Sequence, residues 1–281
     1  MASFQVAPAP WTDWLDWSLD GDQGLVRKTM EDGAVAATLA AGGHRFHVFG
    51  VLDGHGGAET MRYASKHFVP ILYESLKTVE PHVALAKAFM RLDEQIKNNV
   101  TEHSGSTLSV VLIREHPWGV WCANVGDSAI FQRFQNTMQR VTTNHNLETK
   151  VERQRILNHK LLVLEPNGYV RDSKGNMLNM TKSLGDFDFK PGGVSARPTV
   201  KKIEDVECLI LSSDGFTDVI PLRSMKSRWK TLGSNAVAWG HYRRTMFETH
   251  DNTTICILHF KGKPNKENAS LVDAIERLQV F

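Results

Sequence analysis

The sequence contains few cysteines and no long apolar run. Its three cysteines, Cys122, Cys208 and Cys256, lie far apart and form no CxxC pair, so neither a disulfide framework nor a zinc site is expected. No stretch approaches the about 18 apolar residues that a membrane span requires. No lysine or arginine precedes Arg27, although a secretory or transit peptide needs a basic flank. These absences predict buried free thiols in a cytoplasmic protein, with the nucleus as an alternative.

Excess charge of either sign is also lacking. The 33 basic and 31 acidic residues leave a formal charge of +2, without the basic excess that favours nucleic acid or a membrane surface as a partner. We find no internal repeat and no linker rich in glycine, proline or serine across the 281 residues. We therefore expect residues 1–281 to form a single domain, with a monomer as the default state.

The periodicity of apolar residues predicts antiparallel sheets mixed with helices. Residues 44–52 are typical of a buried strand, and two helices are expected between residues 58 and 100. Further strands are predicted at TLSVVLI, WGVWCAN, SAIFQRF, CLILSS and TTICILHF, with helical segments at 148–157, 221–247 and 265–280. Residues 1–20 contain three tryptophans, which indicates an arm or first strand that packs on the domain.

Three aspartates lie where an apolar run ends or begins. Asp53 follows HVFGVL, Asp214 follows LILSS, and Asp251 precedes NTTICIL. An ionised carboxylate is rarely buried unless it is paired or bound to metal, and strand ends are places where distant residues can converge. Turn capping is the simpler interpretation of any single one of them, because Asp followed by Gly or Asn is a common turn pair.

Further acids in short polar segments favour a metal site. RKTMED contributes Glu31 and Asp32, NVGDS contributes Asp127, and DGFTDV contributes Asp218. Oxygen ligands without a histidine or cysteine cluster suit Mg²⁺ or Mn²⁺ better than zinc. Two such ions about 4 Å apart can share a hydroxide and stabilise an in-line displacement at phosphorus.

Seven short motifs resemble those of a known enzyme family. In chain order they are RKTMED, VLDGHGG, SGST, NVGDS, TKSLGDFDF, SSDGFTDV and HDNTT, which together extend from Arg27 to Thr254. This order is similar to that of the metal-dependent type 2C protein serine/threonine phosphatases. The resemblance implies an α+β fold, a four-layer αββα sandwich in which antiparallel helix pairs flank two packed antiparallel sheets. The metals would lie at one end of the sandwich.

The resemblance also implies a role for each matching residue. Asp53 would bridge two Mn²⁺ or Mg²⁺ ions, and the carbonyl of Gly54 would reach the second. Asp214 and Asp251 would bind the first metal, and Glu31 would hold the second through water. Asp127 and Asp218, together with Asp214, would bind a weaker third ion. Asp32 and Asn252 would lie next to these ligands. Arg27 would bind phosphate bidentately, unless it only pairs with Glu31 at the surface.

The implied activity is hydrolysis of phosphoserine and phosphothreonine in protein substrates. A metal-bridging hydroxide would attack the phosphate in line, and His55 would protonate the leaving group, because an imidazole titrates near neutral pH. One alternative is a catalytically inactive binding or scaffold protein, although such a protein should have lost metal ligands that are retained here. A small-molecule phosphoesterase is a second alternative.

Some segments depart from the family pattern. Lys182 and Asn144 replace a family arginine and aspartate, and the stretch 187–200 is short where many relatives carry a longer loop for substrate recognition. Residues 219–247 contain six lysines or arginines and no acid, with aromatic residues among them. A solvated helix face with its aromatics turned inward is the favoured interpretation. Docking of acidic or multiply phosphorylated partners is the alternative.

Overall fold

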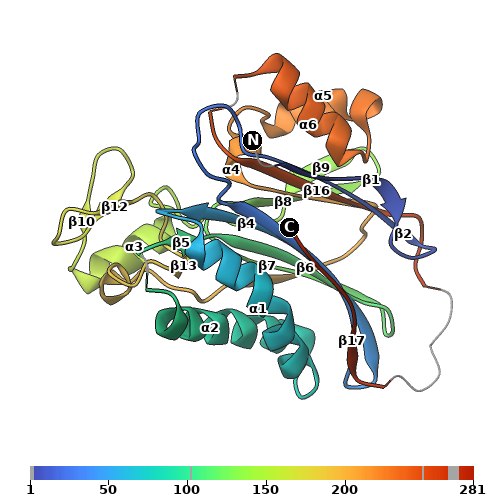
Figure 1. Cartoon of the computed structure of the whole chain (residues 1–281), viewed down its shortest axis with the longest axis horizontal. Helices are drawn as coiled ribbons and strands as arrows, with labels where there is room; N and C mark the ends of the chain where they lie inside the picture. The colour runs from blue at the N-terminus through green and yellow to red at the C-terminus, as the bar shows by residue number, and fades with distance from the viewer. Residues whose placement is uncertain (1–2, 102, 249, 265–271) are drawn as a thin grey trace.

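Two antiparallel sheets pack face to face in the computed structural model, which describes residues 3–101, 103–248, 250–264 and 272–281. Helices cover the outer face of each sheet (Figure 1). The predicted αββα sandwich is therefore confirmed. Among the described residues, no helix is long and apolar enough to cross a membrane.

The first sheet combines strands from both ends of the chain. Its order is β1-β2-β16-β15-β8-β9. The bounds are Ser3–Pro10 for β1, Leu15–Asp22 for β2, Thr253–Phe260 for β16, Cys208–Ser212 for β15, Ala129–Phe134 for β8 and Thr137–Arg140 for β9. The one-turn helix α4 (Asp214–Thr217) leads into α5 (Leu222–Leu232) and α6 (Ala236–Met246), which cover this sheet. The helical prediction for 221–247 is confirmed.

The second sheet is built around β4. Its main path is β17-β3-β4-β6-β7-β14, and two short strands, β5 and β13, continue it from the end of β4. The bounds are Ala274–Val280 for β17, Asp32–Ala41 for β3, His44–His55 for β4, Leu108–Arg114 for β6, Gly119–Val125 for β7, Thr199–Ile203 for β14, Gly105–Ser106 for β5 and Leu184–Gly185 for β13. The two predicted helices are α1 (Glu59–Leu76) and α2 (Pro81–Asn99), which pack on this sheet.

A small sheet is inserted between β9 and β13. Its strands are β10 (Val163–Leu164), β11 (Val170–Arg171) and β12 (Met177–Leu178), and α3 (Lys150–His159) precedes them. This α3 confirms the helix expected at 148–157. The stretch 187–200 contains the short helix η1 (Lys190–Gly192) and the first two residues of β14. The segment that protrudes at the β4 end of the sandwich is thus the three-stranded sheet rather than that stretch (Figure 1).

Strand β4 is buried on both faces, which explains its near-continuous apolar run. Phe46, Val48 and Leu52 pack against the helices, whereas Phe49 and Val51 lie in the core between the sheets. Successive side chains of a strand point to opposite faces, so a strand covered on both sides needs apolar residues at nearly every position. All three cysteines are free and buried, as the sequence predicts.

The tryptophan-rich segment at the N-terminus takes part in the central core. It forms β1, the turn that follows and most of β2, and β2 pairs with β16. Trp11 and Trp17 lie among the buried residues between the two sheets. The indole rings therefore bury apolar area at the edge of the first sheet rather than in a separate arm.

The prediction of a helical tail is wrong for the described part of it. Residues 274–280 form β17, which pairs with β3, while 265–271 lie outside the described residues. A β-bulge between Ile275 and Arg277 shifts the alternation of β17 by one residue. The apolar residues Ile275 and Leu278 are consequently three positions apart, a spacing that resembles a helix. The strand covers an edge of β3 that would otherwise be open.

Candidate functional site

The predicted acids come together at one end of the sandwich. Asp53 lies at the end of β4 directly opposite Asp32 on β3. Asp214 follows β15, and Asp251 precedes the neighbouring strand β16. Electrostatic interactions link Asp53 with Asp214, Asp32 and Asp127, and link Asp214 with Asp251. The structure thus brings these carboxylates together from five separate segments, as the strand-end pattern predicts.

The backbone around Asp53 is held by hydrogen bonds from neighbouring strands. The Asp53 N–H donates to Thr107 Oγ1 at 3.1 Å, and the Thr107 N–H donates to the Asp53 carbonyl at 2.8 Å. The Gly54 N–H donates to the Glu31 carbonyl at 3.0 Å. A Cβ at Gly54 would lie 2.6 Å from that carbonyl oxygen, so only glycine permits this approach. Glu31 is thereby fixed next to the turn that carries Asp53.

In the acid cluster of Asp32, Asp53, Asp127, Asp214 and Asp251, Asp32 is buried and the other four acids are partly buried. Burial and the carboxylates of Asp214, Asp32 and Asp127 hold the pKa of Asp53 well above its usual range. Burial, with help from Asp127 and Asp251, raises the pKa of Asp214 to about 6. Burial raises the pKa of Asp32 to about 7, although hydrogen bonds from neighbouring hydroxyl groups oppose the shift. A cation in this cluster would stabilise the ionised carboxylates.

Two orphaned oxygens fit a cation as well. Asp32 Oδ2 and Asp127 Oδ1 are buried without a hydrogen-bond partner. The atoms of the cluster that could bind a metal are all oxygens, which suits Mg²⁺ or Mn²⁺. Nevertheless, among the residues that the structure describes, no three His, Cys, Asp or Glu side chains are arranged tightly enough to form a complete metal site. The composition of the cluster fits a divalent ion, and its side chains would have to close around one.

Arg27 pairs with a cluster acid rather than with Glu31. Its Nη2 lies 2.8 Å from Asp251 Oδ2, and both side chains are partly exposed. The side chain of the adjacent Asn252 holds this loop in place. Asn252 Oδ1 accepts from the Glu31 N–H at 2.7 Å, and its Nδ2 donates to the Gln23 carbonyl at 2.7 Å. The guanidinium therefore lies at the solvent rim of the acid cluster.

His55 has a carboxylate partner that sequence reasoning did not assign. Its Nε2 lies 3.0 and 2.9 Å from the two carboxylate oxygens of Asp186. Asp186 follows β13, which reaches the end of β4 through β5. Burial alone would lower the pKa of His55, but the Asp186 carboxylate outweighs it and the net pKa is raised. The only sequence signal was the aspartate of the TKSLGDFDF motif, to which no role had been given.

The two acids predicted for a third ion occupy the outer part of the cluster. Asp218 lies at the end of α4 and is open to solvent on one side. Partial loss of water around its carboxyl, followed by repulsion from Asp214 and Asp251, raises its pKa. Asp127 lies after β7, where its main-chain carbonyl accepts from Arg140 Nη2 at 2.5 Å. Burial raises the pKa of Asp127, and Asp218 contributes in the same direction. The two side chains therefore interact, although Asp218 is open to solvent.

Comparison with known proteins identifies the family. A sequence model described as Protein phosphatase 2C matches residues 21–225, which include most of the acid cluster. The chain belongs to the protein phosphatase 2C family. It is 31% identical over 207 residues to Protein phosphatase 2C 50 of rice, Oryza sativa subsp. japonica, which covers 62% of this chain and 52% of that protein. It is 29% identical over 215 residues to Protein phosphatase 2C homolog 1 of Saccharomyces cerevisiae, covering 69% and 74%.

A solved structure of the phosphatase 2C family shares the fold. The serine-threonine phosphatase 2C of Toxoplasma gondii superposes with a TM-score of 0.71 at 17% sequence identity. The match covers 92% of this chain and 99% of that structure. At this level of identity the comparison supports the sandwich architecture and does not extend to individual side chains. The chain spans about half the length of the rice relative.

Gly215 allows the segment after β15 to approach the segment before β16. A Cβ at this position would lie 2.0 Å from the Asn252 carbonyl oxygen. We therefore expect Gly215→Ala to separate Asp214 from Asp251, lowering both activity and the free energy of unfolding, the latter by about 1–3 kcal/mol. Urea unfolding measures the loss. Gly262→Ala is the matched control, because nothing lies within 4 Å of a Cβ there. Equal stability of the two variants would contradict the prediction.

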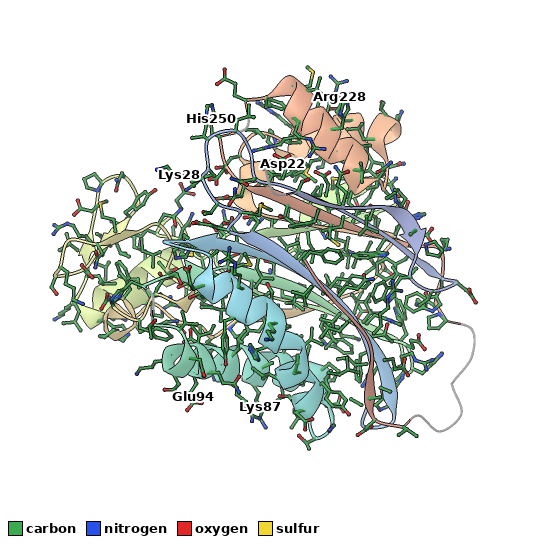
Figure 2. The ribbon with its side chains drawn as sticks, in the orientation of Figure 1. Asp22, Lys28, Lys87, Glu94, Arg228 and His250 are labelled. Carbon is green, nitrogen blue, oxygen red and sulfur yellow. The ribbon has the colours of Figure 1, made fainter. Side chains whose placement is uncertain are left out.

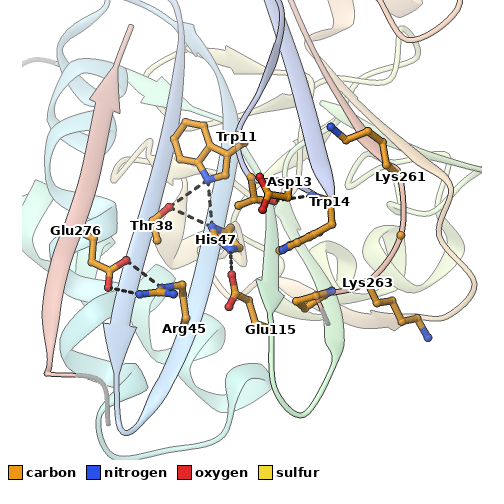
Figure 3. A pocket seen from close by; sticks show the side chains of 13 residues that line it. Trp11, Asp13, Trp14, Thr38, Arg45, His47, Glu115, Lys261, Lys263 and Glu276 are labelled. Atoms are coloured by element: carbon orange, nitrogen blue, oxygen red, sulfur yellow. Dashed lines mark hydrogen bonds and ion pairs between the residues drawn. The ribbon is translucent and has the colours of Figure 1, made fainter. Parts of the chain in front are cut away.

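A polar cavity lies near the start of β4, at the other end of the strand from Asp53 (Figure 3). Its volume is about 760 Å³, and Trp11, Thr38, His47 and Glu115 are among its lining residues. The Trp11 indole N–H donates to Thr38 Oγ1 and to His47 Nδ1, both at 3.1 Å, and His47 Nε2 donates to Glu115 Oε1 at 2.8 Å. His47 precedes Asp53 by six strand residues, or about 20 Å. This buried network joins the turn between β1 and β2 to strands β3 and β4 of the second sheet, away from the acid cluster.

Proposed function

We propose that the chain is a Mn²⁺- or Mg²⁺-dependent phosphatase that acts on phosphoserine and phosphothreonine in proteins. The observation that carries the proposal is the partly buried acid cluster with Arg27 at its rim and His55 held by Asp186. Family membership supports the reaction class, and the retained acids support activity over the scaffold alternative. A cytoplasmic location and a monomeric state stay predictions.

The ions would be held by the residues that the family resemblance assigns. Asp53, Asp214, Asp251 and Glu31 would provide carboxylates, the carbonyl of Gly54 would add a ligand, and Asp127 with Asp218 would hold a weaker third ion. Such ions supply neutralisation of phosphate charge and activation of the attacking water. Asp32 and Asn252 would orient the ligands from behind, because Asn252 fixes the backbone of Glu31.

Arg27 is suited to bind the phosphoryl group. Its side chain is 51% exposed, so a phosphate can reach the guanidinium at the rim of the cluster. A planar guanidinium donates two parallel hydrogen bonds to phosphate oxygens, which positions the group as well as attracting it. Binding would exchange the carboxylate of Asp251 for phosphate as the partner of Arg27. Asp251 would then be free to accept a cation.

His55 is suited to protonate the oxygen that leaves with the serine or threonine side chain. Because Nε2 bonds to Asp186, the proton for the leaving oxygen would come from Nδ1. The carboxylate favours the protonated imidazole and fixes the plane of the ring. An alkoxide is a poor leaving group, so an acid at this position lowers the barrier to cleavage.

The test is hydrolysis of a phosphothreonine peptide with Mn²⁺, with Mg²⁺ and with a chelator. We expect turnover with either metal and none with the chelator, and we expect Asp53→Ala to be inactive under all conditions. Calorimetric titration with Mn²⁺ should show binding to the wild-type protein and weaker binding to the variant. Activity that resists chelation would overturn the proposal. A protein that binds no Mn²⁺ and leaves the peptide intact would favour the scaffold alternative.

Replacing Asp186 tests the role of His55. We expect Asp186→Asn to lower kcat for a phosphothreonine peptide roughly tenfold or more with little change in KM. The loss should shrink with p-nitrophenyl phosphate, whose phenolate leaves without protonation. Asp188→Asn is the matched control, because Asp188 pairs with Lys174 and His103 instead. An equal loss of kcat with both substrates would indicate a structural role for Asp186 and contradict the assignment.

A further inference from the structure

The outward face of α5 carries charge of one sign only. Residues 219–247 contain no acid. The four cationic side chains of α5 are all exposed: Arg223, Lys226, Arg228 and Lys230. Within the described part of the chain, Arg223, Lys226 and Lys230 form no ion pair, whereas surface cations such as Lys77, Lys202 and Lys261 do. Helix α2 instead mixes Lys87 and Arg91 with Asp93 and Glu94. The positive charge of α5 is therefore not neutralised by neighbouring side chains.

The orientation of α5 is fixed by its inner face. Met225 is buried, and Trp229 packs against the same apolar cluster beneath α5 and α6. The guanidinium of Arg133 lies 5.3 Å from the Trp229 ring, and that of Arg228 lies 5.3 Å from the Tyr242 ring. These contacts confirm that the aromatic residues of the basic segment turn inward. They also hold the opposite face of the helix toward solvent.

Three cations follow one another along that solvent face. Arg223, Lys226 and Lys230 are spaced by three and four residues, which places them on one side of a helix. We call them the α5 stripe. The stripe is about 10 Å long at 1.5 Å of rise per residue. An extended peptide advances about 3.3 Å per residue, so the stripe can face three or four consecutive residues.

The stripe begins a few residues after an acid of the cluster in the sequence. Helix α4 starts with Asp214, the exposed Asp218 follows it, and α5 begins at Leu222. Arg223 is therefore the member of the stripe nearest in sequence to Asp214 and Asp218. Figure 2 shows Arg228 on the same side of the molecule as Lys28 and His250, and on the side opposite Lys87. A polypeptide whose phosphorylated residue lies at the cluster can continue along α5.

We propose that the α5 stripe docks an acidic stretch of the phosphoprotein substrate, close in sequence to the phosphorylated residue. The proposal rests on the proposed phosphatase function and adds a substrate class to it. Charge complementarity is the argument, because three exposed cations without ion-pair partners among the described residues attract a run of carboxylates or phosphates. The stripe is one helix wide and the whole chain carries a charge of only +2, which favours a short peptide over an extended anionic surface.

The test compares two phosphothreonine peptides of equal length, one with four glutamates beside the phosphothreonine and one with four glutamines. The glutamates are placed on each side in turn. We expect kcat/KM to favour an acidic peptide roughly tenfold at low salt, and Arg223→Glu/Lys226→Glu/Lys230→Glu to remove this preference. High salt should also remove it. Hydrolysis of p-nitrophenyl phosphate should be unchanged in the variant, because the stripe lies outside the catalytic cluster.

The control variant is Lys87→Glu/Arg91→Glu/Lys97→Glu on α2, which makes the same change in net charge with three exposed cations. It should keep the preference, and equal losses in the two variants would overturn the proposal in favour of a general charge effect.

Fluorescence anisotropy of the labelled acidic peptide without its phosphate measures binding to the α5 stripe even if turnover is absent. Failure to hydrolyse p-nitrophenyl phosphate would refute the phosphatase function alone. Tighter, stripe-dependent binding to mixed phosphatidylcholine and phosphatidylserine vesicles than to the peptide would overturn the peptide assignment.

Discussion

Asp53→Asn should abolish phosphatase activity and, at the same time, raise the melting temperature of the metal-free protein. The activity falls because asparagine would not provide the carboxylate that we propose holds the ions, and several kcal/mol of transition-state stabilisation correspond to a loss of about 10³-fold or more. The stability rises because the substitution removes one carboxylate from a buried cluster whose members repel one another. Removal of about 1 kcal/mol of repulsion should raise the melting temperature by about 2–4 °C.

The two effects are measured separately. Calorimetry in the presence of chelator at neutral pH reports the melting temperature, and peptide hydrolysis with Mn²⁺ reports activity. The exposed Asp13 provides the control, since Asp13→Asn should change neither quantity. The sign of the stability effect is decisive, because a site organised only for structure would lose stability when a central acid is replaced. A lower melting temperature for Asp53→Asn would therefore contradict our account of the cluster.

Trp11→Ala should cost about 3–5 kcal/mol of stability, the largest effect that we expect from a single side chain outside the acid cluster. Trp11 is 8% exposed, and its ring meets Trp17 and Phe49 edge-on at centroid distances of 5.2 and 5.1 Å. Alanine would leave a cavity where the two sheets meet. It would also remove the N–H that His47 Nδ1 and Thr38 accept, at the base of the cavity in Figure 3.

Trp11→Phe separates the two contributions. The phenyl ring retains much of the apolar contact and removes only the hydrogen bonds, so we expect a loss of about 1–2 kcal/mol. Urea unfolding followed by far-ultraviolet circular dichroism measures both variants. The phenylalanine variant should hydrolyse p-nitrophenyl phosphate at close to the wild-type rate, because Trp11 lies far from Asp53. A loss below about 1 kcal/mol in Trp11→Ala would show that the inter-sheet core relaxes around the cavity.

Residues whose role follows from a local pattern could be predicted from the sequence. Asp53, Asp214 and Asp251 each stand next to a strand that is recognisable by its apolar run, and the structure places them together. Asp186 could not be found in this way, because its contact with His55 depends on the pairing of β13 with β5 and of β5 with β4. These two-residue strands have no periodicity of their own. The hydrogen bond between His47 and Glu115 could not be predicted either, because it joins residues far apart in the sequence.

Helices and strands could be predicted where the periodicity of apolar residues is regular. The helices α1 and α2 follow long amphipathic patterns, and β4 follows a continuous apolar run. The tail was misassigned because a bulge changes the spacing of Ile275 and Leu278. A bulge depends on the partner strand and so leaves a misleading pattern in the sequence. The three short strands β10 to β12 were missed because two residues cannot display alternation.

The pairing of the early strands with the last ones sets an order on biosynthesis. Strand β2 pairs with β16, and β3 pairs with β17. Leu19 can therefore pair with Cys256, and Val35 with Val280, only after these late residues have been synthesised. A ribosome completes the N-terminal strands first, so one edge of β2 and one edge of β3 remain without partners until β16 and β17 have been made. Such distant pairing slows folding and leaves open edges that other chains can join. Each sheet is therefore completed only after its late strand, β16 or β17, has been made, and Asp251 joins the acid cluster at that stage.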